Sequence, residues 1–203
     1  MIIFDLDMTL ANCEHRRHFI RPTCKECKCE LTKEIEFDIG WHCPYPCDNV
    51  TYKTDWKPDR KAFYEACDKD TPIKASMEIL HILFACEKDI HIWSGRCETV
   101  WDKTEEWLLD YLEMKYCVKF NPSKNLKMRP IGDTTPDDEL KERWLDEYLN
   151  SMWPKLDKDA PDGTVYKRKD PIQFVFDSDP ESIKMWKRRG IFVYNCNQND
   201  EEF

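Results

Sequence analysis

The sequence predicts an α/β fold, a Rossmann-like parallel sheet with helices on both faces and a small cysteine-rich insertion after the first strand. Short apolar runs alternate with segments of helical period, which is typical of a doubly wound sheet. Several of these runs end in acidic or hydroxyl side chains, and five of the eleven cysteines lie between positions 24 and 47. A length of 203 residues suits one α/β domain plus an insertion.

The first predicted strand is the apolar run at residues 2–4, which leads into the sequence Asp5-Leu6-Asp7-Met8-Thr9. Side chains alternate along a strand, so Asp5 and Asp7 are expected to project the same way. In open α/β sheets, ligands bind at the carboxyl ends of the strands. Because buried carboxylates need a partner, a divalent cation is the natural companion of this pair. A strand that simply ends in an acidic turn is the alternative.

Further strands are predicted at residues 89–96, 125–130, 172–179 and 191–194. The strand at 89–96 ends in Ser94, Gly95 and Arg96, which can bind a phosphate through a hydroxyl, backbone amides and a guanidinium. An ordinary strand-to-helix turn with a serine cap is the alternative. The strand at 172–179 ends in the acids Asp177 and Asp179.

Helices are expected between these strands. Residues 73–86 carry apolar side chains at helical spacing, and residues 97–115 form a second such segment. A short amphipathic helix is expected within residues 54–72. A loop from Gly132 enters a helix that carries Lys141 in its first turns, and the last helix starts near Ser182 and ends at Gly190.

The cysteine-rich segment spans residues 21–53. Cys24 and Cys27 are separated by two residues, and Cys43 and Cys47 by three, which is the spacing of a four-coordinate structural zinc site. Cys29 and His42 are spare candidates for a ligand. Since the segment has little apolar content, a Zn²⁺ ion would supply stability that burial does not. Free thiols in a loosely ordered insertion are the alternative. The predicted organisation is therefore a core of residues 1–20 and 54–203 with an inserted zinc knuckle or cap at 21–53.

Charge and hydropathy exclude some classes of function. A net charge of −9 disfavours a broad non-specific grip on long nucleic acid, although a local pocket for one phosphate remains compatible with it. No apolar stretch is long enough to predict a membrane span. The chain enters its first strand at once, so no signal peptide is expected, and a cytoplasmic location is predicted (host cytoplasm for a viral protein).

In order along the chain, these motifs resemble those of the haloacid dehalogenase superfamily of phosphohydrolases. The stretch from Phe4 to Leu10 is similar to its first motif, Ser94 to its second and Lys141 to its third. Asp177 with Asp179 is similar to the fourth. The resemblance spans essentially the whole chain outside the cysteine segment.

A closer likeness is to the 3′-phosphatase domain of phage-type polynucleotide kinase/phosphatases. Its motifs are matched by Trp93-Ser94-Gly95-Arg96, by the stretch from Gly132 to Lys141 and by Met185-Trp186-Lys187-Arg188-Arg189-Gly190. Arg60 matches an arginine upstream of the second motif. The sequence has no P-loop, so the kinase half is not represented.

The resemblance implies a Mg²⁺-dependent phosphomonoesterase. Asp5 is the implied nucleophile and Asp7 the implied general acid and base, while Asp177 joins Asp5 and the backbone carbonyl of Asp7 in binding Mg²⁺. Ser94 and Lys141 are implied to donate hydrogen bonds to the phosphoryl oxygens. Five further residues are expected to contact or position substrate: Thr9, Arg60, Gly95, Arg96 and Asp133.

The implied substrate is a 3′-phosphate at a nucleic-acid end. A nucleotidase acting on free nucleoside monophosphates is the alternative, and the acidic net charge favours it slightly. A zinc-bearing binding module on a non-catalytic core is a third interpretation. No obligate protein partner and no membrane partner are inferred.

Two positions depart from the family pattern. Met8 stands where the family usually has glycine, and Ser178 separates two acids that are adjacent in this subgroup. The inserted cysteine segment is also foreign to the kinase relative. It follows the first motif, where the superfamily places cap modules that shape access of substrate.

Overall fold

The computed structural model describes residues 1–24, 26–27, 29–33, 41–44, 57–114, 120–152 and 171–197. The chain forms two compact units. The first unit comprises residues 1–12 and 72–203, and the second comprises residues 13–71. The second unit contains the predicted insertion at 21–53 together with the segments that flank it. The two-residue strands β2 (Ala11–Asn12) and β5 (Thr71–Pro72) lie where the chain passes from one unit to the other.

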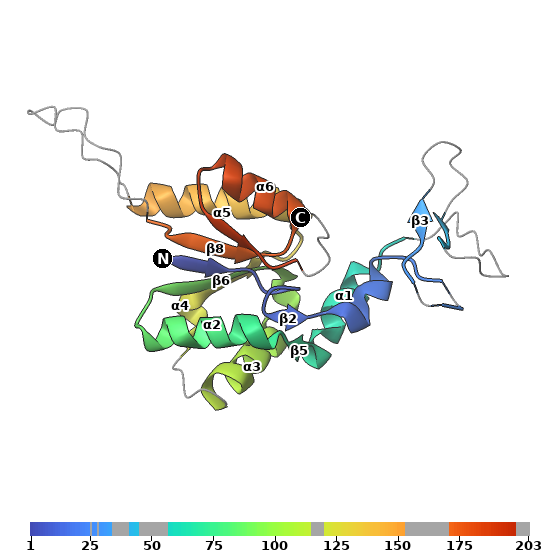
Figure 1. Ribbon diagram of the computed structural model, residues 1–203, viewed down its shortest axis with the longest axis horizontal. Helices are drawn as coiled ribbons and strands as arrows, with labels where there is room; N and C mark the ends of the chain where they lie inside the picture. The colour runs from blue at the N-terminus through green and yellow to red at the C-terminus, as the bar shows by residue number, and fades with distance from the viewer. Residues whose placement is uncertain are drawn as a thin grey trace, which may run out of the picture. The chain divides into compact units, whose positions relative to one another are not determined.

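A five-stranded parallel sheet forms the centre of the first unit, which confirms the predicted fold class (Figure 1). Its strands are β1 (Ile2–Phe4), β6 (Ile90–Cys97), β7 (Leu126–Arg129), β8 (Phe174–Asp177) and β9 (Val193–Asn195). Their spatial order is β7-β6-β1-β8-β9. In chain order this is 3-2-1-4-5, so the direction of winding reverses beside β1. Such reversals are where doubly wound sheets bind ligands.

Strand β1 lies at the middle of the sheet and is buried on both faces. It pairs with β6 in the register Phe4 to Ile92, and with β8 in the register Phe4 to Phe176. Ile2, Ile3 and Phe4 are each at most 1% exposed. A strand covered by helices on both sides must be apolar throughout, which is why this run shows no alternation.

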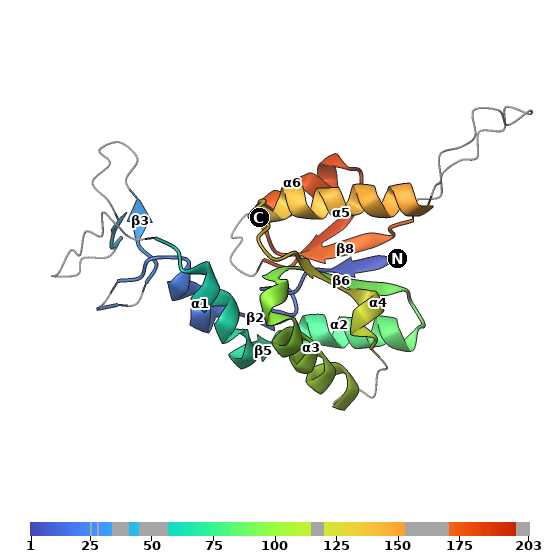
Figure 2. The same cartoon turned by 180° about the vertical axis from the view of Figure 1, so that it is seen from behind.

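Helices cover both faces of the sheet, as Figures 1 and 2 show. On one face lie α5 (Asp137–Met152) and α6 (Pro180–Arg188), and on the other lie α2 (Lys74–Ala85) and α3 (Trp101–Leu109). The single turns η3 (Glu98–Val100), η4 (Asp110–Met114) and α4 (Pro122–Asn125) complete the described helical segments of this unit. None of the helices in the described ranges is long and apolar enough to cross a membrane.

Three tryptophans form the centre of the core between the sheet and the α5–α6 layer. Trp93 of β6 packs edge-on against Trp144, with ring centroids 5.8 Å apart, and lies 6.0 Å from the ring of Trp186. All three are at most 3% exposed. Burying aromatic side chains of this size fixes α5 and α6 against the sheet, and so fixes the residues that these helices carry to its edge.

Local sequence explains where the site-bearing helices begin and end. Helix α6 begins after Asp179, whose carboxylate accepts a hydrogen bond from the backbone N–H of Ser182 at 2.8 Å. Pro180 follows at the first helical position, which needs no N–H. The helix ends before Gly190, whose φ of +73° is readily adopted by glycine.

The segment predicted as one helix within 54–72 is shorter in the structure. Helix α1 covers Arg60–Glu65 and is followed by the 3-10 turn η2 (Ala66–Lys69). The start is set by Asp59, whose carboxylate accepts from the N–H of Ala62 at 2.9 Å. Residues 54–56 lie outside the described ranges.

A buried ion pair stabilises the described part of the second unit. Arg16 belongs to the 3-10 helix η1 (Glu14–Phe19), and its Nε and Nη2 donate to the two oxygens of Asp70 at 2.8 and 2.7 Å. Both side chains are fully buried. The guanidinium also lies over the ring of Phe63 from α1, at 4.1 Å from its centroid. A bidentate guanidinium with an aromatic face beneath it is a favourable way to bury this charge.

Asp70→Asn removes the countercharge of Arg16 and leaves a buried guanidinium without it. We expect this change to destabilise the second unit by roughly 3–5 kcal/mol. Urea unfolding followed by tryptophan fluorescence measures the loss, with the exposed Asp68→Asn as matched control. An unfolding midpoint that is unchanged in Asp70→Asn would show that this ion pair does not hold the unit.

Candidate active site

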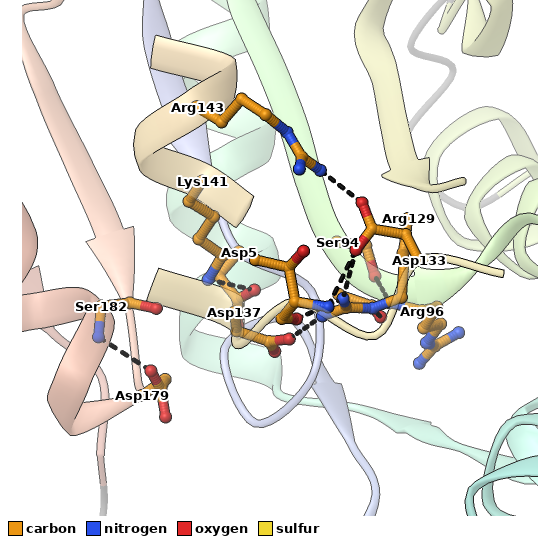
Figure 3. Close-up of polar contacts among 12 residues, drawn as sticks. Asp5, Ser94, Arg96, Arg129, Asp133, Asp137, Lys141, Arg143, Asp179 and Ser182 are labelled. Carbon is orange, nitrogen blue, oxygen red and sulfur yellow. Dashed lines mark hydrogen bonds and ion pairs between the residues drawn. The ribbon is translucent and has the colours of Figure 1, made fainter. Parts of the chain in front are cut away.

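The carboxyl ends of β1, β6 and β8 bring several of the predicted residues of the first unit together. Asp5 follows β1, Ser94 lies in the second half of β6, and Asp177 is the last residue of β8. Lys141 approaches them from the second turn of α5. Figure 3 shows the lysine pointing from its helix towards Asp5.

The ammonium group of Lys141 bridges two acids. Its Nζ donates to Oδ1 of Asp5 at 2.9 Å and to Oδ2 of Asp177 at 2.8 Å. All three residues are buried, with exposed fractions of 1% for Lys141, 6% for Asp5 and 0% for Asp177. The two carboxylates therefore converge on one point, although they come from strands more than 170 residues apart in sequence.

Other donors complete this group of acids. The hydroxyl of Thr9 donates to Oδ2 of Asp5 at 3.2 Å, and the indole N–H of Trp186 donates to Oδ2 of Asp177 at 2.9 Å. The backbone N–H of Asp179 donates to the other oxygen, Oδ1, of Asp177 at 3.0 Å. The aspartates are thus fixed in orientation from several sides, as a site that acts on its ligand in one geometry requires.

Burial raises the pKa of Asp5 to about 8, against the lowering effect of the Lys141 charge, with Asp177 raising it further. For Lys141 burial opposes the charge, but Asp177 and Asp5 together raise the pKa of its ammonium above the usual value. The lysine therefore stays protonated.

Asp7 points to a different partner. Its Oδ1 accepts from Nε and Nη2 of Arg96, at 2.8 and 2.5 Å, and the guanidinium of Arg96 is fully buried. The backbone carbonyl of Asp7 accepts from the hydroxyl of Ser178 at 3.0 Å. In this structure Arg96 therefore orients the carboxylate of Asp7, and its contact with substrate stays a prediction.

The turn after Asp7 contains Met8, at the position where the family that the motifs resemble usually has glycine. Met8 has a φ of +60°, in the left-handed region that glycine adopts without strain. The turn is closed by the N–H of Met8, which donates to the carbonyl of Ala11 at 2.7 Å. A methionine in this conformation carries some conformational cost.

Ser94 lies at the start of a β-bulge. The pairing of β6 with β7 shifts register between Ser94 and Cys97, so two extra residues, Gly95 and Arg96, lie on β6. Such bulges often re-aim side chains beside active sites. Ser94 is fully buried, and its Oγ accepts from the backbone N–H of Arg96 at 3.2 Å.

Arg129 and Asp137 form part of the site that the sequence analysis did not single out. Nε of Arg129 donates to the carbonyl of Gly95 at 2.9 Å, and its Nη1 donates to the carbonyl of Thr135 at 2.5 Å. Its Nη2 is paired with Asp137. The carboxylate of Asp137 lies against Gly95 so closely that a Cβ there would overlap it, which explains the glycine. Burial raises the pKa of Asp137, while Lys141 and Arg129 lower it.

A feature of the sequence could have identified Asp137 as a site residue. It is the first residue of the helix that carries Lys141, and one turn separates the two side chains. No feature of the sequence identified Arg129, because an arginine at the end of a short strand is usually a surface residue. Only the bulge shows why it is buried.

The remaining predicted residues have other surroundings. Asp133 accepts from the N–H of Thr135 at 2.8 Å and is paired with Arg143, and hydrogen bonds from Thr135 lower the pKa of Asp133. Asp179 is the N-cap of α6. Arg60 is the first residue of α1 in the second unit and is exposed there.

The donor set of this site fits Mg²⁺. Asp5, Asp177 and the carbonyl of Asp7 offer the oxygen ligands that the ion prefers. The surrounding charges also fit, because the acids outnumber the buried cations. The acids are Asp5, Asp7, Asp137, Asp177 and Asp179, and the cations are Arg96, Arg129 and Lys141. A dication would balance this excess of negative charge.

The second unit brings together several of the predicted zinc ligands. The sulfur atoms of Cys24, Cys27 and Cys43 lie within 4.8 Å of one another, and this group can bind a metal such as zinc. Cys47, the fourth predicted ligand, lies outside the described residues.

Comparison with known proteins places the fold. No family model matches the sequence, and no curated protein matches it. Among solved structures, a chain of the "Pnkp1/Rnl/Hen1 complex" matches with a TM-score of 0.53 at 17% identity, over 96% of this chain and 44% of that one. A chain of the "Pnkp1/Rnl/Hen1 RNA repair complex" matches with a TM-score of 0.50 at 17% identity, over 96% and 41%. This chain thus spans less than half the length of either, and the likeness is one of fold.

The pKa of Asp5 leads to a prediction about stability. Its folded-state value of about 8 lies above the unperturbed 3.8, so ionisation favours the unfolded state. In metal-free protein this aspartate should lower the free energy of unfolding progressively as pH rises between about 4 and 8. Asp5→Asn should therefore raise the melting temperature in the presence of a chelator at about pH 8, and have a smaller effect at about pH 5.

Thermal unfolding of wild type and Asp5→Asn at the two pH values measures this difference. Asp102→Asn, an exposed aspartate in α3, is the matched control and should melt like wild type at both. If Asp5→Asn melts below wild type at the higher pH, burial is not what governs the ionisation of Asp5.

Proposed function

We propose that this chain is a Mg²⁺-dependent phosphomonoesterase of the haloacid dehalogenase type, which removes a 3′-phosphate from a nucleic-acid end. The observation that supports it best is the buried bridge from Lys141 to Asp5 and Asp177 at the reversal point of the sheet. Two carboxylates and an ammonium group are costly to bury in a protein core. They suit a site that binds a cation and an anionic group side by side.

Asp5 is the proposed nucleophile. Its carboxylate attacks phosphorus, the bond to the leaving oxygen breaks, and an aspartyl-phosphate forms. The hydrogen bonds from Thr9 and Lys141 keep the carboxylate in a single orientation for this attack. Bound Mg²⁺ would neutralise charge between the nucleophile and the phosphate.

Asp7 is the proposed general acid and base. It gives a proton to the leaving oxygen, and later takes one from the water that hydrolyses the aspartyl-phosphate. Arg96 fixes the orientation of this carboxylate through two of its nitrogens. The hydroxyl of Ser94 and the ammonium of Lys141 are the proposed donors to the phosphoryl oxygens.

The proposed substrate rests on the resemblance to polynucleotide 3′-phosphatases and on the likeness of fold to chains of an RNA repair complex. Arg60 and Asp133 are proposed to help position that substrate. The net charge of −9 favours instead a free nucleotide, which needs no extended basic surface. For the cysteine group we propose Zn²⁺, the ion that thiolates bind in structural sites.

Turnover of a generic phosphomonoester by wild type and Asp5→Asn tests the proposed chemistry. The amide cannot form an aspartyl-phosphate, so the rate should fall by roughly 10³-fold or more. Asp102→Asn should retain full activity, and a chelator should abolish it in wild type. Equal rates in wild type and Asp5→Asn would exclude Asp5 as the nucleophile.

A substrate panel separates the two enzymatic alternatives. Oligonucleotides with a 3′-phosphate should be turned over with a higher kcat/KM than nucleoside 3′- or 5′-monophosphates, because an adjacent strand adds contacts. The reverse order would identify a nucleotidase. A protein that retains its zinc and acts on no phosphate ester would instead favour a binding module.

A further inference from the structure

Four cysteines of the second unit form a cluster, which we call the thiol cluster: Cys24, Cys27, Cys29 and Cys43. The Sγ of Cys29 lies 3.1 Å from that of Cys27 and 3.4 Å from that of Cys43, and Cys27 and Cys43 are 3.5 Å apart. Cys24 lies within 4.8 Å of both Cys27 and Cys43, and Cys29 lies farther than this from Cys24. None of the four forms a disulfide in the structure.

Two separate turns of the backbone bring these thiols together. Thr23 and Glu30 pair as an antiparallel bridge, and the N–H of Cys24 donates to the carbonyl of Cys29 at 2.8 Å. Cys24 and Cys29 thus close the 23–30 turn, and Cys27 lies within it. Cys43 comes from elsewhere, directly after β4 (Trp41–His42), which pairs antiparallel with β3 (Thr32–Lys33).

Apolar packing does not account for the cluster. Cys24 is buried, but Cys27 is exposed, and Cys29 and Cys43 are only partly buried. Among the residues of 21–31 and 43–44 whose burial the structure describes, the buried apolar side chains are those of Pro22, Cys24 and Leu31. A thiol is a weak hydrogen-bond donor, so mutual S–H contacts add little. The pairing of β3 with β4 joins the two segments that carry the thiols, but it does not require their sulfur atoms to meet.

Three of the thiols, those of Cys27, Cys29 and Cys43, are separated by nearly the distances expected around one ion. A tetrahedral zinc site with Zn–S bonds of about 2.3 Å has sulfur atoms about 3.8 Å apart. The three contacts among Cys27, Cys29 and Cys43 are slightly shorter than this edge, so small movements would admit an ion. Each thiol would lose its proton to solvent on binding.

We propose that the thiol cluster binds one Zn²⁺ and that Cys29 is one of its four ligands, with Cys24, Cys27 and Cys43. The ion would tie the 23–30 turn to the end of β4. Four thiolates leave no open position, so the role of this site is structural. This assignment replaces Cys47, the ligand predicted from spacing, with a cysteine that the structure places against two of the others.

Metal content and cobalt substitution of the full chain test the assignment without any phosphate ester, so the outcome is independent of the proposed enzymatic function. Purified wild type should contain one zinc per chain. After exchange with Co²⁺, the near-ultraviolet sulfur-to-metal absorption reports the number of thiolate ligands. Cys29→Ser should lower this absorption by about a quarter, as expected for one of four ligands. Cys47→Ser and Cys86→Ser, an exposed cysteine of the first unit, should leave it unchanged.

Cys29→His keeps the assignment testable if Cys29→Ser does not fold. Imidazole is a good zinc ligand, so this variant should keep one zinc per chain while losing the absorption of one thiolate. Loss of absorption in Cys47→Ser with none in Cys29→Ser or Cys29→His would assign Cys47 and overturn the proposal. Wild-type protein that is purified under reducing conditions without zinc, and takes up no Co²⁺, would overturn it as well.

Discussion

The candidate site of the first unit depends above all on the buried ammonium group of Lys141. Asp5 and Asp177 come from neighbouring strands, and without a positive charge between them their burial would be strongly unfavourable. The lysine can reach both because α5 is fixed against the sheet by Trp144, which packs on Trp93. The packing that forms the core of the unit therefore also sets the geometry of its candidate site.

Two arginines extend this arrangement around the acids. Arg96 holds Asp7, and Arg129 fills the bulge at Gly95 while pairing with Asp137. Each arginine connects a segment at the end of one strand with a segment at the end of the neighbouring strand. The segments that carry the acids are therefore fixed to one another. A preorganised set of charges of this kind is what phosphoryl transfer requires of a protein, since positioning and electrostatics supply most of the catalysis.

Much of this could be predicted from sequence, because strand ends in a parallel sheet lie together whatever their spacing in the chain. Asp5, Ser94 and Asp177 follow from that rule, and Lys141 from the resemblance to a known family. The partners of Arg96 and Arg129 could not be predicted, because they depend on a register shift that no local pattern reports. The contact of Cys29 with Cys27 and Cys43 likewise depends on how two turns meet, whereas spacing alone favoured Cys47.

The central claim is that Asp5 and Asp177 share one Mg²⁺ and that Asp5 accepts the phosphoryl group. A crystal structure with Mg²⁺ and beryllium fluoride, which mimics a phosphoryl group on a carboxylate, tests it most directly. The account predicts beryllium bonded to an oxygen of Asp5, and Mg²⁺ bound by Asp5, Asp177 and the carbonyl of Asp7. Beryllium fluoride on another residue, or Mg²⁺ bound away from Asp177, would contradict it.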